Sequence, residues 1–217
     1  MKELFLIICA YMIGSIPTAL IISRKFFGID IREYGSGNMG ATNTFRVLGS
    51  RYGTIVMVCD ILKGMAAVAL YNLLPFYLHQ GSGLERTNFM IGLGLSAVLG
   101  HVFPIWAEFK GGKGVATLFG MILAIQPVIA GSCVAVFLIV LYLTRFVSLS
   151  SILAGLMLPV SVLWIWNEHE ILYRIFALFV ALLIILTHQK NIGKLLRGVE
   201  SRIPIFKYRD KRKNRQK

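Results

Sequence analysis

The chain has 217 residues, of which 56% are hydrophobic and only 15% are charged, and its mean hydropathy is +0.71. This composition excludes an ordinary soluble domain and is typical of an integral membrane protein. The formal net charge of +13 could indicate a nucleic-acid partner, but 11 of the 23 Lys and Arg residues lie from Lys190 onward. We therefore expect the excess positive charge to face a lipid bilayer, and we expect no nucleic acid to bind.

Six apolar runs, nearly free of charge, follow one another along the chain, and about 20 residues are needed for a helix to cross a bilayer. The fourth run is the longest and contains Gln126-Pro127, so it forms either one long helix or two short ones. We expect the first run to remain in the membrane, because no small-residue cleavage site follows it. The runs are Leu4–Ile22, Thr54–Leu78, Asn88–Phe103, Val115–Leu143, Leu149–Trp166 and Ile171–Thr187.

The positions of Lys and Arg decide between one and two helices in the fourth run. With two helices there are seven spans, and 19 of the 23 Lys and Arg residues then lie on the side of the C-terminus. One long helix would place the basic tail outside, against the positive-inside rule. The sequence therefore predicts an all-α integral membrane protein with seven transmembrane helices, its N-terminus outside and its C-terminus cytoplasmic. We expect residues 1–206 to form one membrane domain and 207–217 a basic cytoplasmic tail.

Residues 35–43, Gly-Ser-Gly-Asn-Met-Gly-Ala-Thr-Asn, form a polar, glycine-rich run in the first basic loop. Glycine lets the backbone adopt unusual conformations and bring its N–H groups close to a ligand. Arg46 follows and adds a guanidinium that can bind a phosphate with two parallel hydrogen bonds. The run is therefore suited to a phosphorylated small molecule. The side chains that can donate to it are Ser36, Asn38, Thr42 and Asn43.

Charged residues inside and beside the spans need partners. Asp60 and Lys63 lie one turn apart within the second span, and we expect them to pair. Charges inside a membrane are costly and are often functional, so this pair is either functional or a structural support beside the first loop. Asp30 and Glu33 are expected to be counter-ions that orient nearby arginines.

A second polar run precedes an unusually short apolar stretch. Val115–Ile125 has 11 residues, which at 1.5 Å per residue cover roughly 16 Å, about half of the hydrocarbon core. A half-helix that starts at membrane depth presents free N–H groups and its positive dipole end to an anion. The sequence is not a Walker loop, because Ala107 stands where the first glycine belongs, so we expect no ATP. The residues that offer an anion site here are Gly111, Gly112, Lys113 and Gly114.

Two further clusters lie on the same predicted side. Ser148 begins the sixth span, where it is either a helix N-cap or a substrate contact. His188 and Asn191 follow the last span and share one helix face if the helix continues. His188 is either a partner of the helix dipole or a group that binds or reacts.

Metal-binding patterns are absent from the sequence. The three cysteines lie in apolar stretches without metal-like spacing, and we expect them to be inert thiols: Cys9, Cys59 and Cys133. Glu168, His169 and Glu170 are contiguous and lie on the opposite side, so a metal is not expected there. We expect no metal and no other cofactor.

Three of these motifs together carry a resemblance that extends over nearly the whole chain. The run 35–43 with Arg46, the run 101–117, and His188 with Asn191-Ile192 resemble the signatures of the bacterial acyl-phosphate:glycerol-3-phosphate acyltransferase family. The resemblance implies transfer of a fatty acyl group from acyl phosphate to the 1-hydroxyl of sn-glycerol 3-phosphate. The products would be lysophosphatidic acid and inorganic phosphate, formed at the inner face of the bacterial cell membrane. Lys194 stands where this family would have arginine.

The clusters can be given roles in this reaction, although the sequence leaves open which phosphate each of them binds. In the arrangement that we expect, Ser36, Arg46 and Lys113 hold glycerol 3-phosphate. An acyl phosphate is already activated, so we expect direct attack by the glycerol hydroxyl, with Lys113, Asn191 and His188 as the catalytic groups. A soluble enzyme that makes acyl phosphate is a further partner. The groups expected to hold the acyl phosphate head are the Gly111–Gly114 backbone, Asn38, Thr42, His188 and Asn191.

A transporter of phosphate or of an organic phosphate is the alternative function. Glycine-rich breaks and half-helices near a cationic cluster also occur in carriers. Against this reading, all the polar clusters fall on one side and the sequence contains no visible internal repeat.

Overall fold

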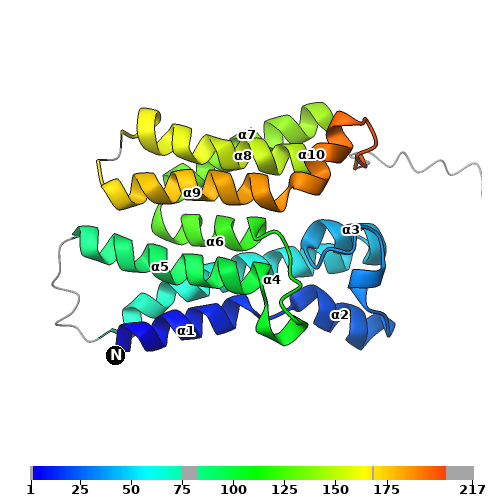
Figure 1. Ribbon diagram of the computed structural model, residues 1–217, viewed down its shortest axis with the longest axis horizontal. Coiled ribbons are helices and arrows are strands. Elements are labelled where there is room, and N and C mark those ends of the chain that lie inside the picture. Colours follow the sequence, from blue (N-terminus) through cyan, green and yellow to red (C-terminus); the bar gives the residue numbers. More distant parts are fainter. Residues whose placement is uncertain (1, 75–82, 168, 204–217) are drawn as a thin grey trace, which may run out of the picture.

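The computed structural model describes residues 2–74, 83–167 and 169–203, and in these ranges the regular elements are all helices (Figure 1). The predicted tail 207–217 and the end of the second predicted span lie outside the described residues. The elements are α1 Lys2–Gly14, α2 Thr18–Phe27, η1 Ile31–Glu33, α3 Ala41–Leu48, α4 Ser50–Ala69, η2 Leu70–Leu73, α5 Gly83–Val102, η4 Ile105–Ala107, α6 Val115–Ile125, α7 Pro127–Thr144, α8 Val147–Val160, η5 Ser161–Ile165, α9 Ile171–Thr187 and α10 Gln189–Leu196.

Among the described residues, five helical segments are long and apolar enough to cross a membrane, and a sixth results if α9 and α10 count as one span bent by 61°. The long segments include α1 with α2, and α8 with η5. α6 is also apolar, but with 11 residues it is shorter than these segments. The chain is therefore an all-helical, multi-pass membrane protein.

The fourth apolar run of the sequence is two helices, as predicted. α6 ends at Ile125, Gln126 leaves the helical conformation with φ −141° and ψ 82°, and Pro127 begins α7. Proline suits the first helical position because its missing N–H would have no partner there. The prediction of a half-helix at Val115–Ile125 is thus confirmed in its bounds.

Glycines seat α6 directly against α4. A Cβ at Gly64 of α4 would overlap the carbonyl oxygen of Thr117, and a Cβ at Gly120 of α6 would overlap that of Ile61. The two backbones therefore touch, which fixes the depth of the short helix. The other side of α6 joins an apolar core with α5, α7, α8 and α9, in which Val98, Met121 and Val180 are almost fully buried.

The same kind of contact joins α1 to α5. A Cβ at Gly14 would overlap the carbonyl oxygen of Ala97, and a Cβ at Gly100 would overlap that of Tyr11. Ser96 of α5 donates to the Ile7 carbonyl at 2.8 Å. Close packing of α1, α4, α5 and α6 therefore forms a rigid group of helices beside α7, α8 and α9 (Figure 1).

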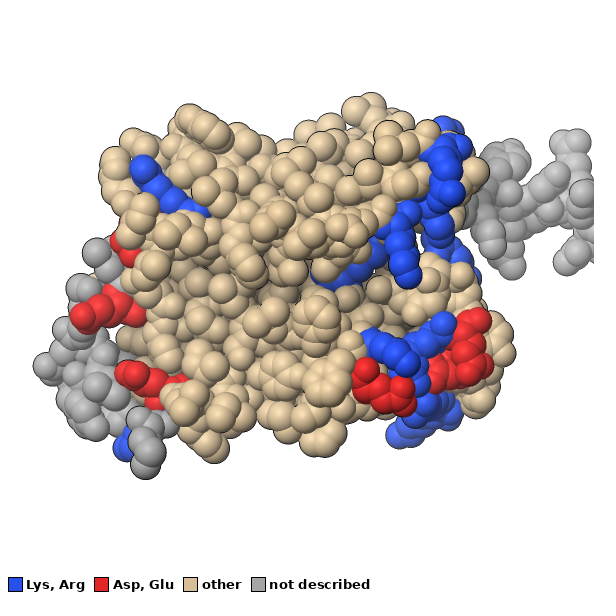
Figure 2. Space-filling view, in the orientation of Figure 1, with Lys and Arg blue, Asp and Glu red and all other residues tan. Residues whose placement is uncertain are grey.

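Basic side chains gather at one end of the molecule. Figure 2 shows the Lys and Arg residues concentrated at the end that carries α2, α3 and α10, whereas the N-terminus of α1 lies at the opposite end. Large apolar side chains on the outer faces of α7 and α9 are exposed, among them Leu138, Ile139 and Phe179. Such an exterior is what a helix facing lipid requires.

Candidate active site

The first glycine-rich run folds around a buried asparagine. Asn43 is 1% exposed, its amide nitrogen donates to the carbonyls of Ile31 and Tyr34, and its Oδ1 accepts from the backbone N–H of Ser36 at 2.8 Å. Gly35, at φ 63°, lies so close that a Cβ would overlap Asn43 Oδ1. We predicted that Asn43 contacts substrate, but the structure uses both of its amide protons to hold the loop.

The other polar side chains of this run face outward. Asn38 Oδ1 accepts from the Gly40 N–H at 2.9 Å, which leads the chain into α3. Ser36 and Thr42 are exposed. Thr42 and Arg46 lie four residues apart on α3, so they share one face of that helix.

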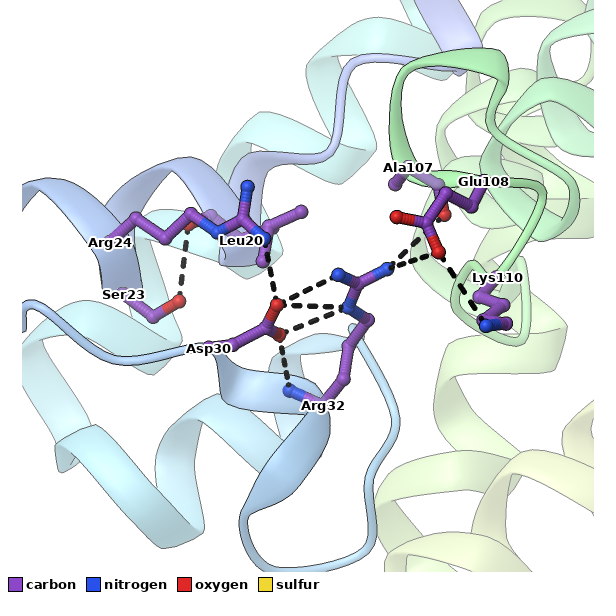
Figure 3. A network of polar contacts seen from close by, with 8 residues as sticks. All are labelled: Leu20, Ser23, Arg24, Asp30, Arg32, Ala107, Glu108 and Lys110. Carbon is purple, nitrogen blue, oxygen red and sulfur yellow. Dashed lines mark hydrogen bonds and ion pairs between the residues drawn. The ribbon is translucent and has the colours of Figure 1, made fainter.

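An ion-pair network ties this loop to the turn after α5 (Figure 3). Asp30 caps η1 by accepting from the Arg32 N–H, and it pairs with the guanidinium groups of Arg24 at 2.8 Å and Arg32 at 2.7 Å. Hydrogen bonding by Arg32 holds the pKa of Asp30 well below its usual range. Arg32 also donates to the Ala107 carbonyl at 3.4 Å and lies 3.9 Å from Glu108. The predicted role of Asp30 as a counter-ion is confirmed.

The second glycine-rich run is attached to the end of α5. The Gly111 N–H donates to the Val102 carbonyl and the Gly112 N–H to the His101 carbonyl, both at 3.1 Å. These two amides are therefore not free for a phosphate, which corrects our prediction for Gly111 and Gly112. Gly114, at φ 80°, turns the chain into α6, whose first turn has backbone N–H groups without intrahelical acceptors.

Lys113 lies between this loop and the C-terminal segment. Its ammonium donates to Asn191 Oδ1, while Asn191 Nδ2 donates to Glu200 Oε1 at 2.7 Å. Because an ammonium can only donate and a carboxylate can only accept, these two partners fix the orientation of the Asn191 amide. Burial, together with repulsion from Lys194 and Arg46, lowers the pKa of Lys113 to about 8 although Glu200 raises it.

Glu200 is a site residue for which the sequence analysis assigned no role. Its Oε1 also accepts from the hydroxyl of Ser148 at 2.7 Å. α8 begins at Val147, with Phe146 as its N-cap residue, so Ser148 does not cap the helix and its hydroxyl orients Glu200 instead. The signal that could have found Glu200 is a carboxylate standing among the Lys and Arg residues that follow His188.

His188 occupies the bend between α9 and α10. It is 2% exposed, and its Nδ1 lies 2.9 Å from the Ile184 carbonyl. Since a carbonyl can only accept, Nδ1 carries the hydrogen in the neutral ring and Nε2 carries the lone pair. The helix does not continue straight past Thr187, but Asn191 remains attached, because its N–H donates to the His188 carbonyl at 2.9 Å.

Arg46 approaches the same cluster from α3. Its guanidinium donates to the hydroxyl of Ser201 at 3.2 Å, next to Glu200 in the chain, and its charge lowers the pKa of Lys113. The structure thus brings together Arg46, Lys113, Ser148, His188 and Asn191 from four separate parts of the sequence.

Within the described residues there is no group of three His, Cys, Asp or Glu side chains that could hold a metal ion. Glu168 lies outside the described residues, and Glu170 accepts a hydrogen bond from Asn88 at 3.1 Å. The site therefore offers ammonium, guanidinium, amide and imidazole groups at the start of a half-helix. These groups define a membrane protein whose site fits phosphate esters.

Comparison with known proteins specifies this class. The family model for glycerol-3-phosphate acyltransferase matches residues 4–198. The glycerol-3-phosphate acyltransferase of Bacillus subtilis (strain 168) is 46% identical over 198 residues, covering 91% of this chain and 96% of that protein. The one from Macrococcus caseolyticus (strain JCSC5402) is 39% identical over 207 residues, covering 95% of this chain and 100% of that protein.

Solved structures agree with this family. The crystal structure of PlsY (YgiH), an integral membrane glycerol 3-phosphate acyltransferase, in its glycerol 3-phosphate form gives a TM-score of 0.83 at 37% identity. This match covers 94% of the present chain and 96% of the PlsY chain. The lysophosphatidic acid form gives a TM-score of 0.77 at 36% identity. The chain belongs to the glycerol-3-phosphate acyltransferase family and is a membrane-bound acyltransferase of phospholipid synthesis, which confirms the resemblance of its motifs and favours the enzyme over the transporter.

Proposed function

We propose that this enzyme takes its acyl group from an acyl phosphate and transfers it to the 1-hydroxyl of sn-glycerol 3-phosphate. The observation that carries the proposal is the cationic cluster of Lys113, Arg46 and Lys194, partly balanced by Glu200, at the N-terminus of α6. Both substrates carry a phosphate, and both would have to meet at one surface of the membrane. A site with several cations and amide donors can hold two anions together.

Glycerol 3-phosphate binds between α3 and α6. The amides of Gly114 and of the first turn of α6 directly follow Lys113 in the chain, so we assign them to the same phosphate as its ammonium, whereas the sequence analysis assigned Gly114 to the acyl phosphate. Arg46 and the hydroxyl of Ser36 complete this site from the first loop. Lys113 also contacts Asn191, which places its charge between the two substrates.

The head group of the acyl phosphate lies on the other side of Lys113. Asn38 and Thr42 approach it from the first loop, and Asn191 and His188 approach it from α10 and the bend before it. The acyl chain extends from this point along the apolar exterior of the helices. Ser148 and Asn43 support the site without contacting substrate, because their polar atoms are bonded to Glu200 and to the first loop.

Transfer is direct. The glycerol oxygen attacks the acyl carbon, the C–O bond to phosphate breaks, and inorganic phosphate leaves while the hydroxyl proton passes to it or to His188 Nε2. The mixed anhydride is already activated, so proximity and charge stabilisation by Lys113 provide most of the acceleration. The Nδ1 contact to the Ile184 carbonyl keeps the lone pair of His188 on Nε2, as a hydrogen-bond acceptor or base requires.

The site faces the cytoplasm in this proposal. Seven spans result when α6 is counted as a crossing half-helix and α9 ends its span at Thr187, and the basic end in Figure 2 then lies inside. The N-terminus is outside, and the C-terminal tail from residue 207 faces anionic lipid of the bacterial inner membrane. On this side a soluble enzyme can supply acyl phosphate, and no metal or other cofactor takes part.

Product formation by the purified, detergent-solubilised protein tests the proposal. The assay contains palmitoyl phosphate, radiolabelled glycerol 3-phosphate and a chelator, and it compares wild type with Lys113→Ala and Lys25→Ala. Lys25 is exposed on α2 at the same basic end, so its loss removes one charge without touching the site. We expect label in lysophosphatidic acid with wild type and Lys25→Ala, and at least a hundredfold less with Lys113→Ala.

Two results would contradict the proposal. No labelled lipid from a folded wild-type protein would exclude acyl phosphate as the donor. Equal activity of Lys113→Ala and Lys25→Ala would show that the substrates do not bind at Lys113. Proteoliposomes provide a separate check on the transporter alternative, because a carrier would move the labelled ester across the bilayer without making lipid.

A further inference from the structure

A cluster of three ionisable residues lies inside the helix bundle, beneath the site. Asp60 and Lys63 of α4 pair at 2.8 Å, and His101 Nδ1 of α5 lies 3.6 Å from the same Asp60 oxygen. All three side chains are at most 7% exposed. Lys63 also donates to the Ile16 carbonyl at 3.3 Å, in the break between α1 and α2. Because an apolar pair would pack here without the cost of desolvating charges, stability alone gives no reason for the cluster.

His101 stands directly against the second glycine-rich run. A Cβ at Gly112 would overlap His101 Nε2, so the loop backbone rests on the edge of the ring that faces away from Asp60. The His101 carbonyl also accepts from the Gly112 N–H at 3.1 Å. The imidazole is thus held between the Asp60 carboxylate on one edge and the loop on the other.

The residues that follow Gly112 are those that hold phosphate in the proposed function. Lys113 comes next, and Gly114 is the N-cap residue of α6. α4 supports this segment at two points, because it holds His101 through Asp60 and also seats α6 through Gly64. A displacement of the ring would therefore move Lys113 and the open amides relative to the bound substrate.

The cluster reaches the first glycine-rich run as well. A small cavity beside it is lined by Asp60, Lys63, His101 and Gly112, and also by Met39 of the run 35–43. Met39 is 5% exposed, so the first loop is anchored here by its one large apolar side chain. Both loops therefore meet beside the same three ionisable groups.

We propose that Asp60, Lys63 and His101 are positioning residues for the acyl transfer: the ion pair holds the His101 ring, and the ring sets the place of Lys113 and the start of α6. This inference rests on the proposed function, in which that segment binds glycerol 3-phosphate. Positional errors near 1 Å can reduce turnover about a hundredfold, so such a support has a large effect without touching substrate.

The test measures two quantities for each variant: KM for each substrate and, by calorimetry without any donor, Kd for glycerol 3-phosphate. His101→Ala is compared with Ser96→Ala, which removes a partly buried hydrogen bond from the same helix to α1 and lies outside the loop. We expect His101→Ala to raise KM and Kd for glycerol 3-phosphate at least tenfold and Ser96→Ala to change them less than twofold. A fall in Tm with Kd for glycerol 3-phosphate and KM for both substrates unchanged would overturn the proposal.

A second set of variants keeps the test valid if His101→Ala does not fold. Asp60→Asn with Lys63→Met removes both charges together, which avoids leaving either one buried alone. If the pair acts through His101, this double variant raises Kd, and adding His101→Ala raises it little further. If the double variant and His101→Ala instead raise Kd by factors that multiply when they are combined, the ion pair does not act through His101.

Failure of this proposal is distinct from failure of the proposed function. If acyl phosphate proves not to be the donor, Kd for glycerol 3-phosphate still reports on the loop. If His101→Ala raises KM for the donor alone, the positioning role stands and the assignment of the two phosphates is wrong.

Discussion

The two glycine-rich loops of this enzyme, which together form the proposed phosphate site, hold their shapes by different physical means. In the run 35–43, Gly35 and Gly37 have φ values of 63° and 72°, and the loop is closed by hydrogen bonds to the Asn43 side chain. In the run 111–114, only Gly114 has a positive φ, whereas Gly111 and Gly112 are glycine because the backbone presses on α5. Hydrogen bonds within the first loop fix its conformation, whereas close contact with α5 fixes the conformation of the second.

The difference predicts which substitution does the most damage. Gly112→Ala should reduce kcat/KM more than a hundredfold, because its Cβ would overlap the ring of the buried His101, which Asp60 contacts at Nδ1. Gly37→Ala should reduce it less than tenfold, since a left-handed alanine costs about 1–2 kcal/mol and its Cβ would lie 3.1 Å from the Arg32 carbonyl. The measurement is the initial rate of labelled lysophosphatidic acid formation by both purified variants. Similar losses would mean that the two loops do not differ as described.

Removing the organising side chain of the first loop should have the next largest effect. Asn43→Ala deletes an acceptor of the Ser36 N–H and the donor to two carbonyls, each of these bonds contributing about 1 kcal/mol. We expect kcat/KM to fall about 10- to 50-fold and Tm to fall by several degrees. Thr42→Ala, one residue earlier and exposed, should leave Tm unchanged. A stable Asn43→Ala protein with full activity would contradict the structural role of this residue.

The second loop carries the group that titrates. Lys113 binds anions only when protonated and has a pKa of about 8, so kcat/KM should be close to its maximum at pH 7, fall to about half at pH 8 and fall further as the pH rises. The substrate phosphate loses its second proton near pH 6 and does not change in this window. Lys113→Arg should keep activity to higher pH, and Glu200→Gln, which removes a charge that raises this pKa, should move the fall to lower pH. An unshifted profile in both variants would assign the titration to another group.

A substitution in the ion-pair network of Asp30 and Arg32 should have the smallest effect. Arg32→Lys keeps one charge beside Asp30 but loses the planar fork that also reaches the Ala107 carbonyl and Glu108 (Figure 3). We expect a two- to fivefold rise in KM for glycerol 3-phosphate with little change in kcat. Lys25→Arg is the matched control, because Lys25 is exposed and lies outside the network. No change in KM would show that the network is not needed to align the loops.

Much of this architecture could be predicted because it depends on local chemistry. Gln126-Pro127 and the distribution of Lys and Arg predicted that α6 and α7 are separate helices. The spacing of Asp60 and Lys63, one helical turn, predicted their ion pair. Lys113, His188 and Asn191 were recognisable because polar groups are rare in so apolar a chain.

The remaining features depend on contacts between distant residues. Ser148 and Glu200 are 52 positions apart, and Lys113 and Asn191 are 78 apart, so no local pattern could reveal their bonds. The inward orientation of Asn43 and the occupied amides of Gly111 and Gly112 likewise follow from how the loops pack, since an asparagine or a glycine has the same sequence signature in either role.

The central claim is that the two loops present different groups to one phosphate site, and backbone hydrogen exchange tests it most directly. Exchange is followed by mass spectrometry on the detergent-solubilised protein with and without saturating glycerol 3-phosphate. The account predicts that the amides of Gly111 and Gly112, and in the first loop those of Ser36 and Gly40, are protected in both conditions, whereas those of 114–117 gain protection only with ligand. Rapid exchange at Gly111 and Gly112 that slows only with ligand, or no change at 114–117, would contradict it.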